Sequence, residues 1–399
     1  MNKDNLNKIK DIISTEELAF VIGNGINLRF FSNVKSWNKL LESLWDKYCK
    51  HNSCGTVWND FIDSGTGEFR GLTTTELFDL IEMNYYGHIT SISFSDMSKY
   101  GKSISEYIKN LKEKVQKREA VSSIVPKTQD ELLKEFKKTN DEFKQNCRNW
   151  CKENITNADE LTDGDCALKM MEVISSNQKL QQNRNQLKKE IAKEYDNYPK
   201  SSGLNDFMLW IKDKNAPVLT TNFDRYMSMT LELEQYKMGE GFTDFYPWNL
   251  YYSYQQLKSP VSGFGIWHIN GLDKYHRSIR LGLSDYMGCV ERARNMIHFK
   301  NMNDFFDGKN QDNWIGQNTW LHIIFNKNLF VFGLKLDDNE VFLRWLLIQR
   351  AKYSKMYNKH LKGWYVNQGI SDGKRAFLET LGFTVINISD HNELYNAFC

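Results

Sequence analysis

Short runs of apolar residues, each ending abruptly in polar residues or glycine, recur along the chain. They cover residues 19–22, 216–221, 265–269, 328–333, 363–366 and 383–387. Continuous apolar runs of this length are typical of strands buried on both faces of a parallel sheet. The pattern therefore predicts a set of parallel strands whose ends are marked by polar residues.

Amphipathic helical patterns separate several of these runs. In residues 37–45 the apolar side chains recur at the spacing of one helix face. Residues 3–18 and 72–86 have helical spacing, and helices are also expected over 339–351 and 373–381. Strands that alternate with helices predict βαβ units, so we expect an α/β fold with a doubly wound parallel sheet.

The composition changes between residues 99 and 200, where Lys, Glu, Gln and Asn dominate and strand-like runs are absent. We interpret this region as a mostly helical insertion. The predicted domain organisation is an α/β core of residues 1–71 and 211–399, interrupted by an insertion over residues 72–210. Its charges alternate in sign, which indicates a solvated surface rather than a binding patch.

The composition argues against several classes of function, among them nucleic-acid, membrane and metal binding. The 399 residues include 52 basic and 50 acidic side chains, so bulk charge favours neither nucleic-acid nor membrane binding. No apolar run approaches the roughly 20 residues of a membrane helix, and the polar start is unlike a signal peptide. The 7 cysteines are scattered without a Cys-x-x-Cys pair, so we expect reduced thiols, no bound metal and a cytoplasmic location.

Polar residues at the ends of the predicted strands are the candidate site. Ligands of doubly wound sheets bind beyond the carboxyl ends of the strands. The candidates are Gly23-Asn24-Gly25, Thr220 to Asp224, His268 to Gly271, Gly333 and Asn367. Each also has a structural interpretation: the glycines fit any tight turn, Asn222 and Asp224 fit helix N-caps, and Trp267-His268 fits a core pair.

Three of these segments resemble motifs of sirtuins. Gly23 to Asn27 is similar to their Gly-Ala-Gly-Ile-Ser loop, Thr220 to Asp224 to their Thr-Gln-Asn-x-Asp motif, and His268 to Gly271 to their His-Gly motif. The nearer resemblance is to the sirtuin-like domains of bacterial antiphage defence systems, over roughly residues 15–45 and 215–390.

This resemblance implies a Rossmann-like NAD-binding core and hydrolysis of NAD+ to nicotinamide and ADP-ribose. It implies an effector that depletes NAD in infected cells, causing abortive infection. Such an effector needs control, which the resemblance assigns to a HerA-type ATPase, a nucleotide-sensing subunit or a homo-oligomer. No direct contact with nucleic acid or membrane is expected.

The resemblance also implies roles for individual residues. Asn222 and His268 are the expected catalytic residues, because an amide can position water and a histidine can accept a proton from water or a ribose hydroxyl. The expected nucleotide contacts are Gly23, Asn24, Gly25, Asn27, Asp224, Asn270, Gly271, Gly333 and Asn367.

One departure from the family pattern bears on the activity. The family's catalytic histidine directly precedes the glycine, whereas Asn270 holds that position here and His268 lies two residues earlier. Residues two apart on a strand point to the same face, which lets His268 take over the role if the segment is extended. The alternative is a catalytically impaired module that senses NAD or a related nucleotide. A protein deacylase is disfavoured because the zinc-binding cysteine quartet is absent.

Overall fold

The computed structural model describes residues 3–32, 34–49, 57–63, 69–90, 184–195, 200–298 and 314–396, and separate residues between 141 and 169. The chain forms two compact units, residues 1–84 with 185–399, and residues 85–184. The first unit contains every candidate site residue. In the second, a short 3-10 helix (Ala158–Glu160) is described, and Arg148 pairs with Asp163 at 2.6 Å.

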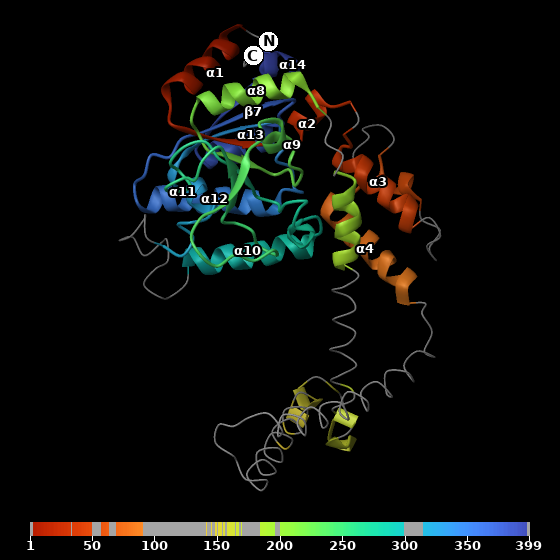
Figure 1. The fold of residues 1–399 in the computed structure, drawn as a ribbon. Helices are drawn as coiled ribbons and strands as arrows, with labels where there is room; N and C mark the ends of the chain where they lie inside the picture. The colour runs from red at the N-terminus through yellow and green to blue at the C-terminus, as the bar shows by residue number, and fades with distance from the viewer. Residues whose placement is uncertain are drawn as a thin grey trace. The chain divides into compact units, whose positions relative to one another are not determined.

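An eight-stranded mixed sheet forms the centre of the first unit (Figure 1). Its order is β3-β4-β5-β2-β1-β6-β7-β8, in which β4 is antiparallel to both of its neighbours, β3 and β5, and the other neighbouring strands are parallel. The strands are β1 (Leu18–Ile22), β2 (Val218–Thr220), β3 (Glu234–Lys237), β4 (Leu250–Ser253), β5 (Ile266–His268), β6 (Asn328–Phe332), β7 (Gly363–Gln368) and β8 (Phe383–Ile388). The predicted α/β class is confirmed.

The central strand β1 is buried on both faces. Ala19 and Val21 belong to one hydrophobic core, and Leu18, Phe20 and Ile22 belong to the other. All five side chains are buried, because alternate residues of a strand point to opposite faces and helices cover both. This double burial explains the uninterrupted apolar run in the sequence.

Helices cover the two faces of the sheet (Figure 1). One core contains side chains of α1 (Lys3–Thr15), α2 (Gly25–Phe30), α8 (Ser202–Asp213), α9 (Tyr226–Thr230) and α14 (His391–Asn396). The other contains side chains of α10 (Leu283–His298), α11 (Leu321–Asn326), α12 (Val341–Met356) and α13 (Asp372–Thr380). None of the helices in the described part combines the length and apolar character needed to cross a membrane.

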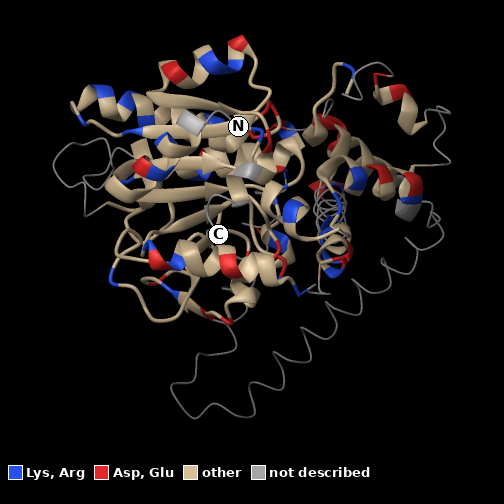
Figure 2. Cartoon of the chain, turned by 90° about the horizontal axis from the view of Figure 1, so that it is seen from above, with Lys and Arg blue, Asp and Glu red and all other residues tan. Residues whose placement is uncertain are grey.

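The remaining helical elements are α3 (Trp37–Tyr48), α4 (Thr74–Thr90), and 3-10 turns at Trp58–Phe61 and His276–Ser278. Both α3 and α4 confirm helical predictions, with ends shifted by a few residues. Charged side chains of both signs are interspersed along the helices, as Figure 2 shows, so neither sign dominates a whole element.

A buried charge cluster connects the helical residues 185–193 to α10. Lys188 Nζ lies 2.8 Å from Asp285 Oδ1, and each side chain is only 1% exposed. Arg280 Nη1 approaches the same oxygen at 3.6 Å. Because removing one partner would leave an uncompensated buried charge, this cluster holds the two segments together.

The turn after β1 packs against the end of β6 through backbone alone. A Cβ on Gly23 would lie 2.5 Å from the Gly333 carbonyl oxygen, and one on Gly25 would lie 2.8 Å from Gly333 Cα. Gly333 itself has φ +64, and a Cβ there would lie 2.8 Å from the hydroxyl of Tyr395. All three glycines are therefore required by close packing.

We expect Gly23→Ala to lower the free energy of unfolding by about 1–3 kcal/mol, because the new methyl group meets atoms of Gly333 and Leu334 in the loop that follows β6. Urea unfolding followed by circular dichroism measures the change. The matched control is Gly373→Ala in α13, where a Cβ meets no atom within 4 Å. There the higher helix propensity of alanine is expected to be neutral or stabilising. Equal stability of the two variants would contradict the packing role.

Candidate functional site

The carboxyl ends of β1, β2, β5 and β6 meet at one edge of the sheet. Ile22 of β1 is in register with Thr220 of β2 and with Phe332 of β6, and Thr220 is in register with His268 of β5. The polar residues that follow these strands therefore lie close together, although they are distant in sequence.

A short chain of hydrogen bonds joins three of these segments. The Asn222 side-chain amide donates to the Gly23 carbonyl at 3.5 Å. Nδ1 of His268 lies 2.8 Å from the Asn222 carbonyl oxygen. Since a carbonyl only accepts, Nδ1 carries the proton and Nε2 carries the lone pair. The predicted catalytic pair, Asn222 and His268, thus lies together beside the glycine turn.

The second ring nitrogen of His268, Nε2, is buried and makes no hydrogen bond to the described residues. Burial, together with a smaller effect of the positive charge of Arg225, lowers the pKa of His268 from 6.5 to about 4, against the opposing effect of the Asn222 hydrogen bond. The imidazole is neutral near pH 7, and its free lone pair can accept a hydrogen bond.

A second buried pair links the turn after β2 to α2. Asn27 Nδ2 donates to Asp224 Oδ2 at 2.7 Å, and the Tyr226 amide donates to Asp224 Oδ1 at 3.1 Å. Asp224 thus caps the start of α9 and binds α2 at the same time. Burial raises its pKa from 3.8 to about 7, more than these hydrogen bonds lower it. The side-chain oxygen of Asn27, Oδ1, is buried without a partner among the described residues.

The backbone amides of Gly23 and Gly25 form hydrogen bonds within the protein. Gly23 N donates to the Phe332 carbonyl at 3.3 Å, and Gly25 N donates to the Gly333 carbonyl at 2.8 Å. These bonds attach the turn to β6. Two of the donors that the resemblance would assign to a pyrophosphate therefore already have partners.

A small pocket opens beside Asn222. It is lined by Asn24, Lys35, Trp37, Tyr195, Asn222, Phe223 and Asp224. Its volume of about 10 Å³ is the space of one water molecule. The rings of Tyr195 and Trp37 pack on Phe223, with centroid distances of 4.7 Å and 5.8 Å, and fill the space around it.

Lys35 is the cation of this pocket. Its Nζ lies 2.8 Å from Glu194 Oε2, and both side chains are about 40% exposed. Lys35 and Tyr195 were not among the predicted site residues, because neither lies at a strand end. An exposed ion pair of this kind contributes little stability, so another anion can easily replace Glu194 as the partner of Lys35.

Asn270 and Gly271 turn the chain beyond β5. The Asn270 carbonyl accepts from the Arg280 amide at 2.9 Å, and Gly271 has φ +93 with Ser278 O only 2.1 Å from a Cβ position. The Asn270 side chain hydrogen bonds to Glu340, whose pKa is nevertheless raised to about 7 by burial. Glu340 Oε2 has no partner among the described residues. No sequence pattern pointed to this carboxyl group.

Asn367 has a different role from the other predicted residues. Its side-chain amide donates to the Tyr365 hydroxyl at 2.7 Å and to the Leu334 carbonyl at 3.5 Å. The Tyr365 hydroxyl in turn donates to Leu334 O at 2.9 Å. These bonds fix the loop after β6, next to Gly333, and none of them involves Asn222 or His268.

The sequence matches no family model and none of the curated proteins with which it was compared. Among the described residues, no group of three or more His, Cys, Asp or Glu side chains could hold a metal ion.

We expect Asp224→Asn to flatten part of the pH dependence of stability. A raised carboxyl pKa stabilises the fold below the ordinary value of 3.8, and this contribution is lost as the pH rises through about 7. The asparagine avoids the loss, since a flipped Asn27 amide can offer its unpartnered oxygen. The variant should be the more stable protein near pH 8, by a few kcal/mol, and should lose this advantage near pH 4.

Urea unfolding at the two pH values measures this difference. His268, whose lowered pKa destabilises the fold as the pH falls through about 4, acts equally in both proteins and cancels. Asp206→Asn, at an exposed position of α8, is the control and should leave the pH profile unchanged. A parallel shift of the Asp224→Asn profile at every pH would contradict the assignment.

Proposed function

We propose that this chain hydrolyses NAD+ to nicotinamide and ADP-ribose. The observation that carries the proposal is the neutral imidazole of His268, whose buried Nε2 is unpartnered among the described residues, held by Asn222 beside the glycine turn. A buried hydrogen-bond acceptor with no partner is costly, which favours a ligand group at this position. The sirtuin-like motifs supply the substrate class.

The strand order supports a Rossmann-like core. When the parallel strands are numbered along the chain, their order across the sheet is 3-2-1-4-5-6. This is the order of dinucleotide-binding folds, in which the ligand crosses the sheet edge where the order reverses. Here the reversal lies between β1 and β6, where the glycine turn meets Gly333, and the Asn222 amide donates to the Gly23 carbonyl in this turn.

The chemistry suits a neutral site. Cleavage of the nicotinamide–ribose bond sends the bonding electrons to nicotinamide, which leaves neutral, and leaves an oxocarbenium-like ribose. Asn222 is proposed to position the attacking water or a ribose hydroxyl. When water adds, its oxygen carries positive charge and becomes strongly acidic. A base as weak as His268 can therefore accept that proton.

NAD+ needs more room than the water-sized pocket beside Asn222 provides. We propose that binding separates Tyr195 and Trp37 from Phe223, and that Asn24 and Lys35 then contact the phosphates. A site that must open is suited to external control. The proposed context is a cytoplasmic antiphage effector, held inactive until a regulatory partner, such as a HerA-type ATPase or a nucleotide-sensing subunit, or self-association opens it.

The second candidate function is a nucleotide sensor without turnover. Two observations favour it: Asn270 occupies the position of the family's catalytic histidine, and the His268 pKa is lowered to about 4. A sensor needs the binding residues at the sheet edge but no proton acceptor.

Nicotinamide release from NAD+ by the purified chain, measured by chromatography, tests the hydrolase. We expect Asn222→Ala and His268→Ala each to lower the rate by about 100-fold or more, since each removes a positioning or proton-accepting group. His360→Ala, at an exposed position, is the control and should retain full activity. Thermal unfolding checks that the variants fold.

The two functions predict different outcomes. Activity lost in Asn222→Ala but kept in a folded His268→Ala would make His268 structural. NAD+ binding in calorimetry without release of nicotinamide, alone or with genomic neighbours, would favour the sensor.

A further inference from the structure

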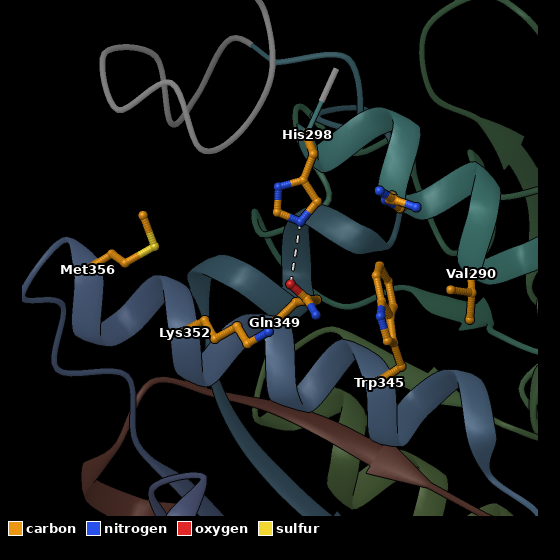
Figure 3. Close-up of a pocket in the computed structure, with 7 residues that line it drawn as sticks. Val290, His298, Trp345, Gln349, Lys352 and Met356 are labelled. Carbon is orange, nitrogen blue, oxygen red and sulfur yellow. Dashed lines mark hydrogen bonds between the residues drawn. The ribbon is translucent and has the colours of Figure 1, made fainter. Parts of the chain in front are cut away.

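A larger cavity lies between α10 and α12. None of the residues that line it also lines the pocket beside Asn222. Its volume is about 480 Å³, within the usual range of small-molecule sites. It is lined by Val290, Arg294, His298, Trp345, Gln349, Lys352 and Met356 (Figure 3).

The cavity is formed by side chains on one face of α10 and on one face of α12. Val290, Arg294 and His298 recur every four residues along α10, and the lining residues of α12 recur at intervals of four, three and four. Such spacing places side chains on one face of a helix. Figure 3 shows His298 reaching across to Gln349, and their polar atoms lie 3.4 Å apart.

The cavity carries positive charge that none of the described residues neutralises. Arg294 and Lys352 are exposed and form no ion pair with any residue the structure describes, and none of the described lining residues is acidic. By contrast, both arginines of α12 have partners: Arg344 pairs with Asp338 at 3.4 Å, and Arg350 donates to backbone carbonyls. Two cations from facing helices, without a counter-ion in the part of the chain that the structure describes, favour an anionic ligand.

An aromatic surface accompanies this charge. Trp345 is half-buried and stacks on Phe342, with ring centroids 6.4 Å apart and an interplanar angle of 15°. This contact holds the indole in place, while Trp345 still lines the cavity beside Val290. A fixed indole offers a stacking surface of the kind that binds nucleobases.

We propose that this cavity binds a mononucleotide-type ligand, with its aromatic ring against Trp345 and its phosphate between Arg294 and Lys352. The site is independent of the proposed NAD+ hydrolysis, because it uses none of the residues at the sheet edge. A ligand bound there would contact α10 and α12, two of the helices that cover one face of the sheet.

Isothermal titration calorimetry of the full chain with AMP tests the proposal. The expected result is binding that weakens by about tenfold or more in Arg294→Ala/Lys352→Ala and in Trp345→Leu, because the phosphate and ring contacts are lost. Adenosine and inorganic phosphate should each bind more weakly than AMP. Lys355→Ala, an exposed lysine of α12 outside the cavity, is the control and should bind as the unmodified chain does.

Asn222→Ala distinguishes the two sites, since AMP could also enter the sheet-edge pocket. The proposal is supported if Asn222→Ala keeps the affinity that the cavity variants lose, with unfolding temperatures showing that all variants fold. It is overturned if AMP does not bind, if the double variant binds AMP as tightly as the unmodified chain, or if phosphate alone binds as tightly as AMP.

Discussion

The close approach of two backbone segments, the Gly23–Gly25 turn and Gly333, is the constraint on which the candidate site depends. The Gly25 amide lies 2.8 Å from the Gly333 carbonyl oxygen, so no side chain fits between them. This contact fixes β1 against β6, and the β1–β2 register then places Asn222 within reach of the Gly23 carbonyl. Backbone packing, rather than side-chain chemistry, sets the geometry of the sheet edge.

The polar groups at this edge share one electrostatic property: burial drives each toward its neutral form. The pKa of His268 is lowered and that of Asp224 is raised, so the imidazole is neutral and the carboxyl is partly protonated near pH 7. Glu340 follows the same rule beside Asn270. A site of neutral dipoles suits the proposed reaction, in which the nicotinamide leaves uncharged and positive charge develops on the ribose.

The elements that could be predicted from the sequence are those with a distinct pattern of apolar residues. The parallel strands were found because double burial makes them continuously apolar. By contrast, β3 has exposed ends at Glu234 and Lys237, and α10 mixes apolar and charged residues, so neither was predicted. Strand-end reasoning found Asn222 and His268, whose meeting follows from the parallel register. It missed Tyr195 and Glu340, which come from a helix end and a loop and carry no local signal.

The buried pair of Lys188 and Asp285 has a consequence for the modularity of the chain. On the other side of the 85–184 unit, Asp79 of α4 accepts a hydrogen bond from the Leu283 amide at 3.1 Å. The segments that precede and follow that unit are thus both fastened to the first turn of α10. Chain ends held close together are the condition under which a domain can be exchanged or shortened without disturbing its host. Evolution could therefore vary this unit while the sheet and its polar edge stay the same.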